Sequence, residues 1–138
     1  HGEQAMVKIL EQVIKDYGPQ VIFTHHNGDL NRDHQLTNAA VLVAARPSFC
    51  VVETIISFEI VFSSNFSVAP RFDPNLYVAL SDSQVSAKIS AWKSYEQEER
   101  PAPFPRNERG LRIAMQHRGL QCGQMYAEAF RVERSIDA

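Results

Sequence analysis

Apolar positions in the first third of the chain alternate between helical and strand-like spacing. From Met6 to Tyr17 they recur three and four residues apart, which predicts an amphipathic helix ended by Gly18-Pro19. The short apolar run from Val21 to Thr24 predicts a strand buried on both faces, as in a parallel sheet. A polar loop, residues 25–33, leads to a helix over 34–46 that is apolar nearly all round, so we expect it to be well buried.

The second half of the chain predicts further strands and helices, separated by segments rich in proline and serine. In chain order we expect one long strand or two joined strands over 51–62, a loop over 63–74, a strand over 76–80, a helix from Ser81 through about Tyr95, a helix over 107–118 and a strand over 126–136. Ser81 and Gln84 have the spacing of a capping box, and Gly119 is expected to close the last helix. Without repeats or a linker, residues 1–138 predict a single α/β domain with helices on a mainly parallel sheet.

The composition is that of an ordinary soluble domain, and it excludes several classes of protein. The 138 residues include 14 Lys and Arg against 16 Asp and Glu, a net charge of −2 that leaves no basic surface for nucleic acid. The longest apolar stretch, residues 39–45, is shorter than the roughly 18–20 residues of a membrane span, and no secretory signal opens the chain. Cys50 and Cys122 have no zinc-type spacing, so we expect reduced thiols in the core of a cytoplasmic protein.

Functional groups concentrate in the loop that follows the first predicted strand. Three of the five histidines, His25, His26 and His34, lie within ten residues of one another. The same ten residues include the carboxylates of Asp29 and Asp33. Because ligands of open α/β sheets bind beyond the carboxyl ends of the strands, this loop is the candidate site.

The position of His34 at the start of a helix favours a neutral imidazole. The positive end of the helix dipole disfavours a protonated ring there, and a neutral ring keeps the lone pair that zinc ligation requires. His34 is therefore either a metal ligand or a plain polar residue of the first turn. Asp33 is either the N-cap of the helix or a carboxylate that orients an imidazole.

The motif from Thr24 to His34, Thr-His-His-x-Gly-Asp-Leu-Asn-x-Asp-His, resembles the second motif of the PIG-L/LmbE-type zinc-dependent N-acetylglucosaminyl deacetylases. The similarity extends over nearly the whole chain, in the family's order, through Phe72-x-Pro74-Asn75, Lys88, Tyr95, Pro105-Arg106, Arg118-Gly119 and Ala127-Glu128-Ala129-Phe130. The resemblance implies a Rossmann-like sheet with helices on both faces and a catalytic zinc at its carboxyl edge. The implied reaction is hydrolytic N-deacetylation of an N-acetylglucosamine-like sugar or sugar conjugate.

The resemblance also assigns a role to His34 and leaves other parts of the metal site outside this sequence. His34 matches the third zinc ligand, whereas the other two ligands and the general base belong to an Ala-His-Pro-Asp-Asp motif that does not occur here. Together with the start at His1 rather than Met, this suggests the carboxyl-terminal two-thirds of a longer domain, incomplete at its amino terminus. We expect such a fragment neither to bind zinc tightly nor to catalyse alone.

The remaining candidate residues surround the implied zinc. Asn31 stands where many relatives have a histidine, and its amide can donate a hydrogen bond to an oxyanion but cannot supply a proton. The proton would come from His25, His26 or the protonated base, so the candidate catalytic residues are Asn31, Asp33 and His26. The candidate substrate-binding residues are His25, Asp29 and Arg106. Asp29 either contacts sugar hydroxyls or caps a turn, and Arg106 either reaches the substrate or is an exposed helix-start residue.

Two other functions are compatible with the same residues. A non-catalytic sugar- or nucleotide-binding α/β module would keep the fold without stoichiometric zinc. A hydrolase of phosphoesters would favour two metal ions and more carboxylates than this loop offers. The expected partner in the main hypothesis is a small N-acetylated sugar, with a homo-oligomer left open.

Overall fold

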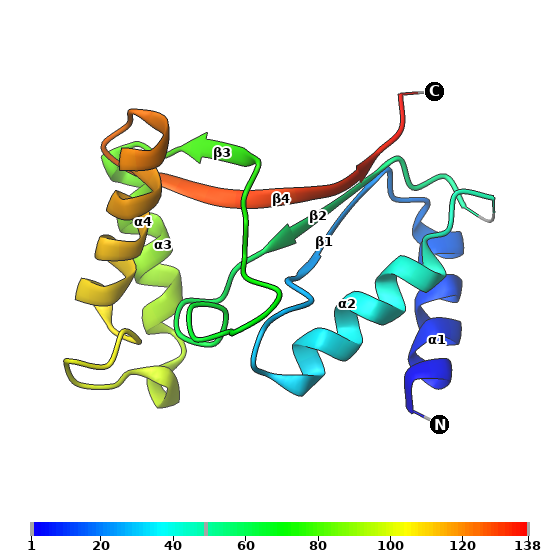
Figure 1. Ribbon diagram of the computed structural model, residues 1–138, viewed down its shortest axis with the longest axis horizontal. Helices are drawn as coiled ribbons and strands as arrows, with labels where there is room; N and C mark the ends of the chain where they lie inside the picture. Colours follow the sequence, from blue (N-terminus) through cyan, green and yellow to red (C-terminus); the bar gives the residue numbers. More distant parts are fainter. Residues whose placement is uncertain (1, 49, 138) are drawn as a thin grey trace. The chain divides into compact units, whose positions relative to one another are not determined.

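The computed structural model describes residues 2–48 and 50–137, which form two compact units. The first comprises His1–Asn75 with Phe130–Ala138, and the second comprises Leu76–Ala129. The elements in chain order (Figure 1) are α1 (Gly2–Tyr17), β1 (Val21–His25), α2 (Arg32–Ala44), β2 (Thr54–Phe58), β3 (Leu76–Ala79), α3 (Asp82–Lys93), a short 3-10 turn (Glu96–Glu98), α4 (Glu108–Cys122) and β4 (Ala127–Ser135). The α/β class expected from the sequence is confirmed.

The strands follow the order β1-β2-β4-β3 and run in mixed directions. β1 and β2 are parallel, with Phe23 opposite Ile56, whereas β2 and β4 are antiparallel, with Phe58 opposite Phe130. The β2–β4 register shifts between Ile55 and Ile56. The parallel pair matters for function, because its strands end at the same edge and His25 is the last residue of β1.

The core of the first unit lies between the helices α1 and α2 and one face of the sheet. Its buried members are Ile14, Val41, Ala44, Ala45, Val52 and Ile55, with Val7, Leu10 and Ile22 packed against them. Alternate residues of a strand point to opposite faces, so Ile22 faces these helices while Val21 and Phe23 face away. α1 ends as predicted, with Gly18 in the left-handed conformation at φ 57°.

Two expectations about burial in the first unit are wrong. Val21 and Phe23 are 48% and 56% exposed, because β1 is the edge strand of the described sheet and these residues face away from α1 and α2. α2 is also less buried than its composition suggests, since Leu42 and Val43 are exposed and only the side carrying Val41 and Ala44 packs into the core.

The segment over 51–62 forms a single short strand, Thr54–Phe58, rather than the long strand or the two joined strands expected. The chain turns after it, because Ile60 and Ser64 exchange hydrogen bonds. The Ile60 N–H donates to the Ser64 hydroxyl at 2.8 Å, and the Ser64 N–H donates to the Ile60 carbonyl at 3.0 Å. This turn brings the following serines toward the loop after β1.

In the second unit the predicted capping box is confirmed, and the predicted end of the last helix is wrong. Ser81 and Gln84 make both reciprocal hydrogen bonds at the start of α3. α4 continues past Gly119, which packs tightly against the backbone of residues 124–125, and ends at Gly123, whose φ of 74° suits glycine. Cys50 and Cys122 are free thiols, as expected, but both are only partly buried, and Cys50 packs against the core of the first unit. Among the described residues, no helix is long and apolar enough to cross a membrane.

Two isoleucines of α1 provide a matched test of this packing. Ile14 is 5% exposed in the core and Ile9 is 65% exposed on the same helix. We expect Ile14→Ala to lower the free energy of unfolding by about 2–4 kcal/mol, because it leaves a cavity, and Ile9→Ala to change it by less than about 0.5 kcal/mol. Urea unfolding of both variants measures the difference, and equal effects would contradict the described face of α1.

Candidate functional site

The loop between β1 and α2 is organised by a cap that the sequence analysis assigned to the wrong residue. The N-cap of α2 is Asn31, whose side-chain oxygen accepts the Asp33 N–H at 2.9 Å. Asp33 therefore lies inside the first turn and is not the N-cap. Its main-chain carbonyl accepts the Thr37 hydroxyl at 2.7 Å.

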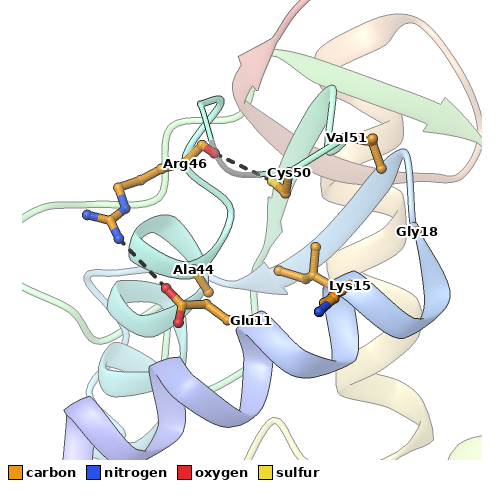
Figure 2. A pocket seen from close by; sticks show the side chains of 8 residues that line it. Glu11, Lys15, Gly18, Ala44, Arg46, Cys50 and Val51 are labelled. Carbon is orange, nitrogen blue, oxygen red and sulfur yellow. Dashed lines mark hydrogen bonds and ion pairs between the residues drawn. The ribbon is translucent and has the colours of Figure 1, made fainter.

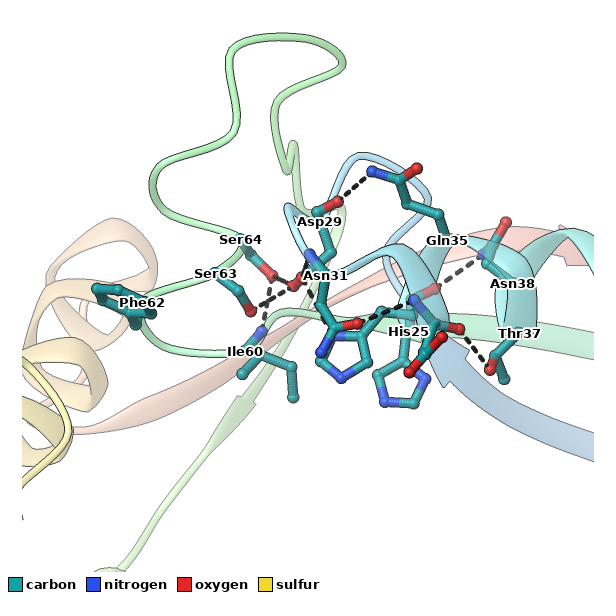
Figure 3. A network of polar contacts seen from close by, with 12 residues as sticks. His25, Asp29, Asn31, Gln35, Thr37, Asn38, Ile60, Phe62, Ser63 and Ser64 are labelled. Atoms are coloured by element: carbon teal, nitrogen blue, oxygen red, sulfur yellow. Dashed lines mark hydrogen bonds and ion pairs between the residues drawn. The ribbon is translucent and has the colours of Figure 1, made fainter. Parts of the chain in front are cut away.

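Asp29 lies at the centre of the polar network around this loop (Figure 3) and is completely buried. One carboxylate oxygen, Oδ1, accepts the Asn31 N–H at 2.8 Å. The other, Oδ2, accepts the hydroxyls of Ser63 and Ser64 at 2.8 and 2.7 Å. Because the carboxylate has no exposed surface, the expected contact with sugar hydroxyls does not fit this geometry, whereas the bond to the Asn31 N–H is that of a turn cap.

The environment of Asp29 favours the ionised carboxylate. Burial by itself would raise its pKa, but hydrogen bonds from Ser64, the Asn31 backbone and Ser63, together with the nearby His34 ring, outweigh burial and hold the pKa below its ordinary value. The site thus contains a buried negative charge next to an imidazole.

That imidazole belongs to His34, in the first turn of α2. Its Nδ1 lies 3.1 Å from Oδ1 of Asp29, and the side chain is 21% exposed. The ring N–H does not point straight at the oxygen, so the contact is an ion-pair distance rather than an ideal hydrogen bond. Because a carboxylate only accepts, this contact favours the tautomer of the imidazole with its proton on Nδ1 and its lone pair on Nε2. The carboxylate that orients the ring is therefore Asp29, and the orienting role considered for Asp33 does not fit.

His25 packs flat against His34. The two ring centroids are 4.0 Å apart with an interplanar angle of 12°, and the His25 ring also contacts Phe58. Burial, and next the electrostatic interaction with the neighbouring His34, lower the pKa of His25, while Asp29 raises it. The His25 carbonyl accepts the Asn38 side-chain amide at 2.8 Å, which anchors the end of β1 to α2. His25 thus covers one face of the His34 ring, and its lowered pKa favours the neutral form.

His26 points into the protein rather than toward the open edge of the sheet. It is buried, its Nε2–H donates to the Pro70 carbonyl at 3.1 Å, and its ring meets Phe72 edge-on. The proton-transfer role expected for His26 is therefore not supported, because the nitrogen that holds the proton is already bonded within the fold. Gly28 completes this packing, since a Cβ there would overlap the Pro70 carbonyl oxygen.

Two further residues named from the sequence lie in the second unit. Arg106 precedes α4, and its Nη1 pairs with Glu98 at 2.6 Å. Glu128, at the start of β4, forms an ion pair with Lys88 of α3.

A zinc ion in a protein typically takes four ligands, and the described residues supply only part of such a set. Within the described part of the chain, no three His, Cys, Asp or Glu side chains gather as a metal site. His34 offers one oriented nitrogen whose opposite side is held by a carboxylate, the usual environment of a ligating histidine. The chain thus fits the role of one zinc ligand and does not hold a complete site by itself.

A separate hollow of about 640 Å³ lies against α1 and the end of α2 (Figure 2). Its floor includes Ala44, and its rim carries an ion pair of 3.7 Å between Arg46 and Glu11. Cys50 donates to the Arg46 carbonyl there at 3.6 Å. None of the loop residues described above lines this hollow, so its size alone does not make it the functional site.

Sequence reasoning missed the residues that hold the site in place. Ser63 and Ser64 lie more than thirty residues after Asp29 in a segment expected to be a loop, and no local pattern marks them. Asn38 could have been predicted to lie near the site, because it follows His34 by four residues and so shares one helix face with it.

Comparisons with known proteins define the fold but not the family. No protein-family profile matches the chain, and no curated protein matches its sequence. A conserved Thermus thermophilus protein, TT1542, has a similar structure (TM-score 0.74, 17% identity, 97% of this chain and 60% of that chain). The zinc-inhibited form of the teicoplanin deacetylase Orf2 is similar as well (TM-score 0.69, 16% identity, 99% of this chain and 55% of that one).

Two other solved structures have a similar fold. An N,N'-diacetylchitobiose deacetylase from Pyrococcus horikoshii matches with a TM-score of 0.68 and 16% identity, over 96% of this chain and 52% of that chain. GalB, a 4-carboxy-2-hydroxymuconate hydratase from Pseudomonas putida, matches with a TM-score of 0.69 and 18% identity, over 98% of this chain and 60% of that one. The LmbE-like α/β fold expected from the resemblance is confirmed. The chain spans 52–60% of the length of these four proteins.

The assignment of the N-cap can be tested by substitution. We expect Asn31→Ala to lower the free energy of unfolding by about 1 kcal/mol, because the Asp33 N–H loses its partner, and Asn31→Asp to preserve stability. Asp33→Ala removes only a carboxylate near the positive end of the helix, so its cost should stay below about 0.5 kcal/mol. Denaturant unfolding of the three variants compares them, and a larger loss for Asp33→Ala would restore it as the cap.

The close approach of Pro70 to Gly28 gives a second test. We expect Gly28→Ala to lower the free energy of unfolding by about 1–3 kcal/mol, since the new methyl group meets a backbone carbonyl that has little room to move. Gly2→Ala is the control, because a Cβ at Gly2 meets nothing within 4 Å. Thermal unfolding measures both, and wild-type stability of Gly28→Ala would rule out the described packing of this loop.

Proposed function

We propose that this chain is part of a zinc-dependent hydrolase that removes the acetyl group from an N-acetylglucosamine-like sugar or sugar conjugate. One observation carries the proposal. Beyond the carboxyl end of a parallel strand, the buried carboxylate of Asp29 lies 3.1 Å from Nδ1 of His34, so Nε2 is the nitrogen left for a metal ion.

The structural comparisons support a deacetylase more than other classes of protein. Two of the similar structures described above are deacetylases, and one of these acts on an N-acetylated sugar by its name. The other is described in a zinc-inhibited form, which associates that fold with zinc without stating a catalytic role for it. At 16% identity these likenesses concern the fold, so the substrate and the metal are our proposal.

The reaction explains why such a site is useful. An acetamide is a poor electrophile, and a bound zinc ion would acidify a water molecule and polarise the carbonyl group. His34 would ligate the metal through Nε2. The oxygen of the Asn31 side chain is used for capping, so its amide N–H groups remain as donors that can stabilise an oxyanion. His25 covers one face of His34 and restricts the ring to one plane.

The remaining metal ligands and the general base are proposed to come from an Ala-His-Pro-Asp-Asp motif outside these 138 residues. This part of the proposal rests on the resemblance and on the single ligand that the described residues provide. The isolated chain should then bind zinc weakly and release no acetate, whereas a longer polypeptide that includes the motif should do both.

A second candidate is the addition of water to a carbon–carbon double bond, which GalB favours as a hydratase of similar fold. A third is the non-catalytic sugar- or nucleotide-binding module considered from the sequence. Stoichiometric zinc would count against the binding module. The reaction product distinguishes the deacetylase, which releases acetate, from the hydratase, which forms a hydrated acid. The cytoplasmic location, the absence of a nucleic-acid partner and the oligomeric state stay predictions.

Acetate release tests the proposed function directly. In a polypeptide that contains this chain and the missing motif, we expect zinc-dependent release of acetate from N,N'-diacetylchitobiose or N-acetylglucosamine, lost on chelation and restored by zinc. His34→Ala should lower that rate by at least about 100-fold and reduce the bound zinc, because it deletes a ligand.

His117→Ala is the matched control, since His117 is an exposed histidine of α4 in the second unit. It should leave both acetate release and zinc content at the wild-type level. Unchanged zinc content and turnover in His34→Ala, or hydration of an unsaturated acid without acetate release, would overturn the deacetylase proposal.

A further inference from the structure

Two serines from a distant turn converge on one oxygen of the buried Asp29. The hydroxyls of Ser63 and Ser64 lie 2.8 and 2.7 Å from Oδ2, and both serines are buried. The Ser64 hydroxyl also accepts the Ile60 N–H at 2.8 Å, so its own proton is directed to the carboxylate. The Ser63 carbonyl accepts the Leu30 N–H at 3.3 Å, which ties the turn to the loop after β1. Figure 3 shows both serines beside Asp29.

This arrangement restricts the carboxylate to one orientation. With Oδ2 occupied by two hydroxyl donors, Oδ1 stays with the Asn31 N–H and with Nδ1 of His34. A rotation of the carboxylate would break the two serine bonds in a site where no solvent replaces them.

The orientation of Asp29 decides which nitrogen of His34 is free. A neutral imidazole in water prefers the tautomer with its proton on Nε2, whereas a carboxylate at Nδ1 selects the tautomer that exposes the Nε2 lone pair. Only that second tautomer can bind a metal ion through Nε2.

We infer that Ser63 and Ser64 are positioning residues that, through Asp29, hold His34 in the tautomer with Nε2 free for a metal ion. The inference rests on the proposed function for the identity of the metal, while the tautomer itself is a property of the metal-free chain. A packing role alone would anchor the turn without affecting the proton on His34.

The tautomer can be measured in the isolated chain. In protein labelled with ¹⁵N at histidine, kept metal-free and at a pH where the ring is neutral, long-range ¹H–¹⁵N correlations distinguish the two forms. We expect His34 of the wild-type chain to carry its proton on Nδ1. In the double variant Ser63→Ala/Ser64→Ala, a large part of the population should move to the Nε2–H form.

Ser67→Ala is the matched control in the same segment. Ser67 is a buried serine whose hydroxyl donates to the Pro70 carbonyl at 3.2 Å rather than to Asp29, so the His34 signals should stay unchanged. Ser63→Thr/Ser64→Thr keeps both hydroxyls and should restore the wild-type tautomer. Backbone amide spectra check that each variant is folded, and the single serine variants replace the double one if it is not.

Zinc binding separates this inference from the proposed function. In the longer polypeptide, the double alanine variant should lose about 10–100-fold in zinc affinity, whereas Ser67→Ala should not. An Nε2–H tautomer in the wild type, or an unchanged Nδ1–H tautomer in a folded double variant, overturns the inference. A longer polypeptide that binds no stoichiometric zinc overturns the proposed function and leaves the tautomer result standing.

Discussion

A carboxylate that is removed from water must receive hydrogen bonds from the protein, and Asp29 receives them from separate parts of the chain. The Asn31 N–H, two residues away, and the hydroxyls of Ser63 and Ser64, from the turn after β2, donate hydrogen bonds to it. The ring of His34, in the first turn of α2, lies 3.1 Å from the same carboxylate. The loop after β1, the start of α2 and the turn after β2 are therefore held together by one buried charge. The other features of the candidate site depend on this arrangement.

The three histidines of this loop are neighbours in sequence or in space, but each makes different contacts. His34 lies beside the Asp29 carboxylate, whereas His25 stacks on His34 and has a lowered pKa. His26 is bonded into the protein and serves the packing of Pro70 and Phe72. Residue type alone does not separate these roles, because each depends on what the ring nitrogens contact.

The fold narrows the reaction without deciding it. Among the similar structures described above, deacetylases and a hydratase share this α/β scaffold. Both kinds of enzyme add water to a substrate, so the scaffold is compatible with more than one such reaction, and function has to be argued from the site. In the described residues the candidate site places His34 beside Asp29 and an Asn31 side chain at the start of α2, and the proposed function is argued from these groups.

The sequence by itself determined the α/β class, the end of α1 at Gly18, the capping box at Ser81 and the position of the candidate loop, because each follows from local periodicity or from a residue with a special conformation. Burial of β1 and the roles of Asp29, Asp33 and His26 were decided only by tertiary structure. Whether Phe23 is buried depends on its neighbours in the sheet, and whether a carboxylate caps, orients or binds depends on donors more than thirty residues away. Contacts between residues far apart in the chain produce no regular spacing in the sequence, because they depend on how side chains fit together in shape and charge.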